Sequence, residues 1–315
     1  MNTSQASRQS ASTSRSLPQS MRQHPLFSFF FLAYAISWIL LLPSVLSAWG
    51  ILPGDFTGSS SAPSITFVLH TFGPAMAAFV MTYLLEGKAG VQRLRQRIRQ
   101  RRAGWVWYLF ILVGIPALIL LGMIIQPGVL ASFQGLPPLV LVSYAIYFVV
   151  VWFGGGPLGE EPGWRGFALP RIQPRYGPLW GTLLLGVLWA FWHLLEFLMP
   201  TQGGGPGTGL ATFLVNFSLF LVLAIGLSVI FTWVFNHTQG SLFVAITAHA
   251  NVDTPQLVLV PLFLAVDYTG LLLAGAIGFG VPALLIVILT RGRLGYQPGQ
   301  KQSLKPEQLE VLPTL

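Results

Sequence analysis

Long apolar stretches, nearly free of charge, constrain this chain more than any other feature of its sequence. Of its 315 residues, 53% are hydrophobic and 8% are charged, whereas a soluble domain carries roughly 25% charged residues. So few charges cannot give a globule of this size a polar surface. The sequence therefore excludes a soluble domain, a disordered chain and a coiled coil, and it predicts an all-α membrane protein.

The apolar stretches predict about eight transmembrane helices, because each crossing needs about 20 mainly apolar residues. The expected spans are 26–47, 64–85, 105–126, 139–157, 178–199, 210–235, 241–258 and 269–290. Polar residues, His249 and Asp253 among them, interrupt the seventh span. In the fourth span, the Gly-Gly-Gly-Pro sequence of residues 154–157 predicts a broken helix.

The basic residues predict which ends face the cytoplasm. All 17 Lys and Arg residues fall in four segments on one side of this eight-span arrangement. Cytoplasmic loops collect Lys and Arg, so we expect both termini in the cytoplasm. The run from Arg93 to Arg102 has no aromatic interleaving, so we interpret it as a topology signal that touches anionic lipid, not as a nucleic-acid site.

The remaining composition defines the expected domains. Residues 1–23 form a basic, Ser-rich segment that fits a disordered tail, and the same composition would fit an organelle transit peptide. We expect a polytopic membrane domain at 26–291 and a C-terminal tail at 292–315. The chain has no cysteine, which excludes a thiol protease, an iron–sulfur protein and a Cys-ligated zinc site.

Several ionisable side chains fall within apolar sequence, where each costs several kcal/mol and so indicates function. They are Glu160, Glu161, Glu196, Asp253, His70, His193 and His249. We expect His70 to be a satisfied polar residue and Glu196 to reach water near the outer interface.

Helical geometry predicts that three of these segments meet. At a rise of about 1.5 Å per residue, Glu160 and His193 both lie roughly 20–24 Å from the breaker-rich turn at residues 173–178. His249 and Asp253 belong to a span that begins on the same side of the membrane as this turn, so they can reach a similar depth.

Spacing within each helix predicts two local pairs. Glu161 and Arg165 are four residues apart, as are His249 and Asp253, so each pair can share one helix face. Glu160 points about 100° away from Glu161, which leaves one carboxylate free to face a cavity.

Three sequence patterns carry a family resemblance. Residues 160–165 read E-E-x-x-x-R, and residues 249–253 read H-x-x-x-[N/D]. Residues 189–193 stand where the second pattern has F-x-x-x-H, with Trp189 in place of Phe. Together they resemble the CPBP (ABI) family of intramembrane proteases, the CAAX prenyl endopeptidase and bacteriocin-processing group. The resemblance covers about residues 139–258, and eight spans match the family's architecture.

The resemblance implies an intramembrane endopeptidase that hydrolyses a peptide bond in a membrane-associated protein or peptide, prenylated CAAX-type proteins among them. By this resemblance, Glu160 and His193 would activate water, with Glu160 as the base. Glu161 would be held by Arg165 as an orienting pair.

The third pattern leaves the role of Asp253 open. The resemblance implies that His249 and its partner stabilise the oxyanion. An ionised Asp can only accept a hydrogen bond, so Asp253 either is protonated or orients His249.

The cofactor also stays open between none and zinc. Glu160, His193 and His249 would make a His₂Glu set with a position left for water, which is a catalytic zinc pattern. The sequence has no H-E-x-x-H motif, and both metal-independent and metal-dependent hydrolysis are consistent with it.

A second class of function is a non-catalytic membrane scaffold or a proton-coupled carrier that uses Glu160 and His193 as a relay. For the endopeptidase, the expected partners are a peptide or lipidated protein substrate and membrane lipids, with no nucleic acid. The family branch implies an integral protein of a bacterial plasma membrane.

Overall fold

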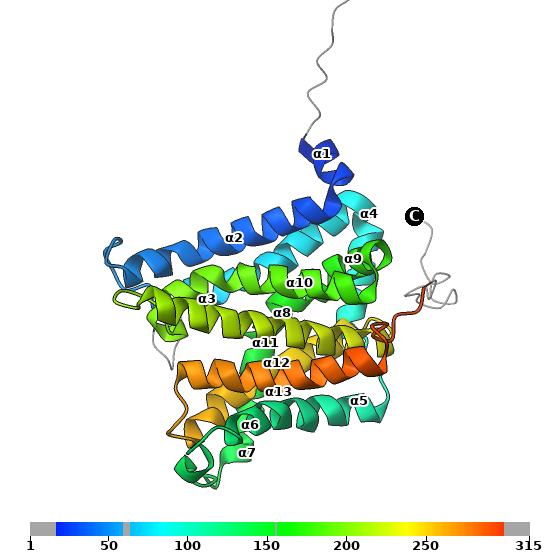
Figure 1. Ribbon diagram of the computed structural model, residues 1–315. Helices are drawn as coiled ribbons and strands as arrows, with labels where there is room; N and C mark the ends of the chain where they lie inside the picture. The colour runs from blue at the N-terminus through cyan, green and yellow to red at the C-terminus, as the bar shows by residue number, and fades with distance from the viewer. Residues whose placement is uncertain (1–16, 59–63, 155, 299–315) are drawn as a thin grey trace, which may run out of the picture.

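The computed structural model describes residues 17–58, 64–154 and 156–298, and it shows a bundle of long helices that lie side by side (Figure 1). Within these residues the only β pairing is an isolated bridge between Phe133 and Phe263. The predicted all-α fold class is confirmed.

The α-helices, in chain order, are α1 (Leu17–Gln23), α2 (Pro25–Ala48), α3 (Ile65–His70), α4 (Gly73–Arg99), α5 (Trp105–Leu109), α6 (Ile115–Ile124), α7 (Val140–Phe153), α8 (Gly156–Glu161), α9 (Leu169–Tyr176), α10 (Pro178–Trp192), α11 (Leu210–His237), α12 (Leu242–Val258) and α13 (Tyr268–Leu289). The π-helices are η1 (Phe110–Gly114) and η3 (Pro162–Ala168). The 3₁₀ helices are η2 (Leu130–Ser132), η4 (His193–Leu198), η5 (Pro200–Gln202) and η6 (Val260–Leu262).

Seven helical segments of the described chain are long and apolar enough to cross a membrane, one fewer than predicted. They are Pro25–Ala48, Ile65–Arg99, Trp105–Ile124, Val140–Tyr176, Pro178–Leu198, Leu210–His237 and Tyr268–Leu289. The prediction for 241–258 is corrected: this segment forms α12, a helix of 17 residues whose polar side chains lower its hydropathy.

The short helix α12 lies inside the bundle. It packs against α7, α8, α6, α11 and α4, and nearly all of its residues from Leu242 to Pro255 are buried. Protein surrounds this helix where lipid would otherwise lie, so its polar residues need no contact with hydrocarbon. Ser241 begins the helix, with its hydroxyl accepting a hydrogen bond from the Val244 amide.

The predicted break in the fourth span is present. Helix α7 ends at Phe153 and α8 begins at Gly156, whose φ of 32° is one that side chains with a Cβ rarely adopt. The predicted turn at 173–178 is narrower than expected. Helix α9 continues to Tyr176, and only Gly177, with a φ of 77°, separates it from α10.

The two predicted tails lie mostly outside the described residues. Of the expected N-terminal tail, residues 1–16 are not described, and Leu17–Gln23 form α1 instead of a disordered segment. Of the C-terminal tail, residues 292–298 are described, and the buried Leu294 accepts a hydrogen bond from Asn236 Nδ2. The start of α2 and the end of α13 lie at the same end of the bundle (Figure 1). Which side of a membrane this end faces stays a prediction.

Candidate active site

The residues of the three sequence patterns come together in the interior of the bundle. They are Glu160, Glu161 and Arg165 on α8 and η3, Trp189 and His193 at the junction of α10 and η4, and His249 and Asp253 on α12. The convergence expected from helical depth is thus found.

Glu161 is the centre of a fully buried network. Its Oε1 accepts hydrogen bonds from Arg165 Nη1 at 3.0 Å and from His249 Nδ1 at 2.9 Å. The guanidinium of Arg165 lies over the rings of Trp189 and Phe231, 4.8 and 4.9 Å from their centroids. The expected Glu161–Arg165 contact is present, and the bond to His249 is an additional one. A carboxylate can only accept a hydrogen bond, so His249 carries a proton on Nδ1. Its Nε2 lies on the side of Asp253.

Glu160 is held by two tryptophans. Trp164 and Trp189 each donate an indole N–H to the same carboxylate oxygen, Oε2, at 3.1 and 2.7 Å. The other oxygen, Oε1, lies toward Gly156, where an added Cβ would be 4.0 Å from it and 3.5 Å from Asp253 Oδ2. One oxygen of this buried carboxylate is therefore fixed, and the other lies on the side of Asp253.

His193 stands where α10 changes from an α-helix to a 3₁₀ helix. The change frees backbone carbonyls, and side chains bind them: His193 Nδ1 lies 2.9 Å from the Trp189 carbonyl oxygen, and Trp38 Nε1 donates to the Trp192 carbonyl at 2.9 Å. Tyr34 likewise donates to the Leu188 carbonyl. The bond to Trp189 leaves Nε2 of His193 as the free ring nitrogen.

A small cavity of about 110 Å³ lies beside His193 and His249 and has room for several waters. Glu160 is not among the residues that line it, but its carboxylate accepts a hydrogen bond from Trp189, which is one of them. His193, His249, Asp253 and Trp189 line its polar part, and His249 Nε2 lies 3.7 Å from Asp253 Oδ2. The rest of the wall is mainly apolar, and Gln202 and Tyr268 line it near the loops at one end of the bundle. Two imidazoles and a carboxylate thus line one cavity.

Whether zinc can bind depends on how Glu160, His193 and His249 are arranged. In residues 17–298, apart from the short gaps, no group of three or more His, Asp and Glu side chains is arranged to hold a metal ion. Glu160 Oε2 is taken by two indoles, and His249 Nδ1 by Glu161. The atoms that stay free, Glu160 Oε1, His193 Nε2 and His249 Nε2, are not gathered around one point that could hold an ion, so these residues, as arranged, do not form a metal site.

Two buried residues that sequence reasoning set aside lie beside His193. His70 Nε2 lies 3.1 Å from Glu196 Oε1, and that same oxygen lies 3.9 Å from His193 Nε2. Glu196 was expected to reach water, but it is 9% exposed and paired. The three-residue spacing of His193 and Glu196 could have suggested their contact, whereas no local pattern links Glu196 to His70.

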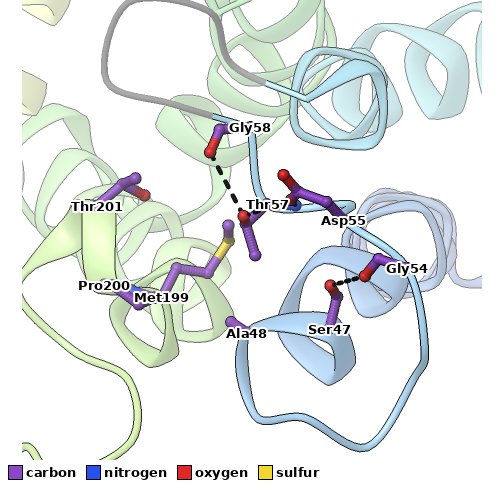
Figure 2. A pocket seen from close by; sticks show the side chains of 9 residues that line it. All are labelled: Ser47, Ala48, Gly54, Asp55, Thr57, Gly58, Met199, Pro200 and Thr201. Atoms are coloured by element: carbon purple, nitrogen blue, oxygen red, sulfur yellow. Dashed lines mark hydrogen bonds between the residues drawn. The ribbon is translucent and has the colours of Figure 1, made fainter.

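A larger cavity, of about 450 Å³, lies elsewhere, between the loop after α2 and η5 (Figure 2). Its lining is Ser47, Ala48, Gly54, Asp55, Thr57, Gly58, Met199, Pro200 and Thr201. Hydrogen bonds from the hydroxyl and the amide of Thr57 lower the pKa of Asp55, so its carboxylate is ionised and satisfied locally. None of the predicted site residues lines this cavity, so its size does not make it the candidate site.

Comparison with known proteins agrees with the geometry. Residues 141–254 match the family model described as type II CAAX prenyl endopeptidase Rce1-like. This range contains all three sequence patterns. Over these residues the chain is similar to this family. A curated relative, CAAX prenyl protease 2 of Methanococcus maripaludis, is 25% identical over 224 residues, which cover 64% of this chain and 77% of the relative. The resemblance inferred from the sequence is confirmed over nearly the expected range.

Proposed function

We propose that this Rce1-like protein is an intramembrane endopeptidase that hydrolyses a peptide bond in a membrane-associated protein, with prenylated CAAX-type proteins as its substrate class. The observation that carries the proposal is the cavity that His193, His249 and Asp253 line, together with a Glu160 carboxylate that Trp189, on the wall of that cavity, and Trp164 hold in place. The match to the family model and the curated relative's name supply the substrate class.

Glu160 and His193 supply the base. Water adds through its oxygen to the carbonyl carbon of the peptide bond, and its proton passes to Glu160 and His193 acting together. When the tetrahedral intermediate collapses, the C–N bond breaks and that proton goes to the departing amine. One water is consumed, and one carboxylate end and one amine end are released.

His249 stabilises the oxyanion in this scheme. Its Nδ1–H is committed to Glu161, which is in turn held by Arg165, so the ring is fixed with Nε2 toward Asp253 and the cavity. A protonated Nε2 presents a donor to the developing negative charge at no cost of reorganisation. Asp253, at 3.7 Å, stabilises that protonated ring.

The test is cleavage of quenched prenylated peptides, and of unmodified peptides, by the purified full chain in detergent. We expect E160A, H193A and H249A each to lower kcat/KM by at least about 100-fold, while each variant still inserts and elutes as the wild type does. Cleavage by the wild type is expected to persist with a chelator. Full activity in any one of the three variants, or activity abolished by the chelator, would overturn this mechanism. A chain that transports protons or holds a partner with no cleavage would instead be a carrier or a scaffold.

A further inference from the structure

A buried pair, His70 and Glu196, adjoins the candidate site without belonging to the three sequence patterns. His70 ends α3 and is 1% exposed, and Glu196 lies in η4. Their side chains meet at 3.1 Å, between residues that are 126 positions apart in the chain. The ring of His70 also stacks on Trp192, at 5.3 Å between centroids and 18° between planes.

Because of the contacts of His70, the His70–Glu196 pair must either carry opposite charges or share one proton between the two side chains. Nδ1 of His70 faces the Phe67 carbonyl oxygen, and Nε2 faces the Glu196 carboxylate. A neutral imidazole has only one N–H, so it cannot donate to both acceptors. The pair therefore holds one proton beyond a neutral imidazole and a free carboxylate, and His70 fixes the position of Glu196 Oε1.

The same carboxylate oxygen faces the candidate site. Glu196 Oε1 lies 3.9 Å from Nε2 of His193, the ring nitrogen that the Trp189 carbonyl leaves free. This repeats the arrangement at the other histidine of the cavity, where His249 Nδ1 is held and Nε2 lies 3.7 Å from Asp253. Each cavity histidine thus has one nitrogen bound and a carboxylate beside the other.

Fold stability does not explain this pair. Taking two charged groups out of water costs about as much as their attraction returns, so a buried ion pair is weak evidence for stability. Ionisable residues at membrane depth are expensive and usually mark function. Glu196 Oε1 contacts His70 and also lies near His193, so we expect its function to lie in its effect on His193.

We propose that Glu196, held by His70, is a positioning residue for His193: its fixed carboxylate orients the ring and stabilises the positive charge that His193 carries when it takes the proton of the attacking water. This proposal rests on the proposed peptidase function. It assigns a role to two residues outside the three patterns that define the site.

The test compares E196Q, E196D and H70Q with the wild type, using the full chain in detergent and a peptide that the wild type cleaves. Gln at 196 keeps the size and an acceptor for His70 but removes the charge. We expect E196Q to lower kcat about 10- to 100-fold, with KM within about twofold, because a charge partner at about 4 Å is lost. E196D, which restores the charge, should recover part of kcat. H70Q should lower kcat in the same direction, and H70Q combined with E196Q should lower it no further than E196Q alone.

E86Q is the matched control. Glu86 is also paired, with Arg93 and Arg171, but is part-exposed and does not line the site cavity. We expect it to leave kcat unchanged. A kcat for E196Q within threefold of the wild type, or a loss in E196Q that E196D does not reduce, would overturn the proposal.

A second measurement does not depend on cleavage and separates this proposal from the peptidase function. The chain has five histidines, so ¹⁵N-histidine labelling gives a spectrum simple enough to assign with single variants. We expect E196Q to change the ring signals of His70 and His193 and to leave those of His249 and His237 in place. Unchanged His193 signals would overturn the proposal even if E160A is inactive. Activity that survives in E160A would instead count against the peptidase mechanism.

Discussion

At the scale of single residues, the two indoles on Glu160 give a chemical meaning to a departure from the family pattern. The resemblance expects Phe at position 189, and a Phe ring has no hydrogen to donate. Here Trp189 donates to Glu160 Oε2 at 2.7 Å, while its ring also lies against the guanidinium of Arg165. Trp189 therefore acts on both acidic residues. It donates directly to Glu160, and it packs on Arg165, which in turn binds Glu161.

Replacing Trp189 with Phe should weaken catalysis without removing it. W189F keeps the ring and loses one of two donors to Glu160, and hydrogen bonds to charged groups contribute about 1.5–3 kcal/mol. We expect kcat/KM for peptide cleavage to fall about 10- to 100-fold. W180F, on the same helix with its indole 71% exposed, is the control and should match the wild type. Equal activity of W189F and W180F would show that the indole donor is dispensable.

Asp253 gives a second residue-scale prediction. An amide at this position can accept from His249 Nε2–H and can also donate to an oxyanion, so we expect D253N to keep kcat within about tenfold of the wild type. D253A, which removes both capacities, should lose more. Steady-state cleavage of one peptide by both variants decides the point. A loss in D253N as large as in D253A would mean that the carboxylate itself is required.

Local spacing explains which site contacts were predictable. The pair of Glu161 and Arg165 follows from positions four apart on one helix. The bonds from Glu161 to His249 and from His70 to Glu196 join residues 88 and 126 positions apart. No single sequence encodes such contacts in its local pattern, because they depend on how the helices pack.

At the scale of elements, the first two motifs, at residues 160–165 and 189–193, lie where the backbone changes from an α-helix to another helical form. The π-helix η3 begins directly after Glu161, and the 3₁₀ helix η4 begins at His193. Such departures often occur at functional sites. The expected depths of these residues assumed regular α-helices, and they correctly predicted that the segments meet. They could not predict where η3 and η4 begin, because the periodicity of apolar residues indicates only a regular helix.

Close packing of η3 on α4 depends on a glycine. An added Cβ at Gly163 would lie 2.5 Å from Pro74 Cβ and 2.7 Å from the Pro74 carbonyl oxygen. G163A must therefore push η3 away from α4, and overpacking of this kind costs about 1–3 kcal/mol. We expect a lower Tm in detergent and reduced cleavage, since η3 directly follows Glu160 and Glu161. G209A, where nothing lies within 4 Å of an added Cβ, should keep the wild-type Tm. A wild-type Tm for G163A would show that the two elements can separate freely.

At the scale of the whole molecule, composition predicted the fold class and most of the spans, but not the enclosure of α12. Hydropathy measures how well a segment tolerates lipid, and the polar side chains of α12 lower its hydropathy. The helices packed around α12 cover those side chains. The count of spans therefore depends on tertiary packing that no window of sequence contains. The charge pattern still predicts one cytoplasmic end.

That orientation can be tested cleanly, because the chain has no native cysteine to remove. Gln96 and Gln134 are both exposed, Gln96 among the basic residues at the end of α4 and Gln134 in the loop before α7. We expect a membrane-impermeant maleimide to label Q134C, and not Q96C, in intact bacterial cells, because basic segments stay in the cytoplasm. After lysis both should be labelled. Labelling of Q96C alone in intact cells would reverse the predicted topology.

The burial of α12 has a consequence for how the protein is made. A helix that carries His249, Asn251 and Asp253 partitions poorly into lipid when it leaves the ribosome alone. It can insert stably only by packing against helices that are synthesised before it, among them α6, α7, α8 and α11. The candidate active site is then among the last parts to be assembled during biosynthesis. A nascent chain that lacks those helices would hold its third motif outside the bilayer and have no working centre.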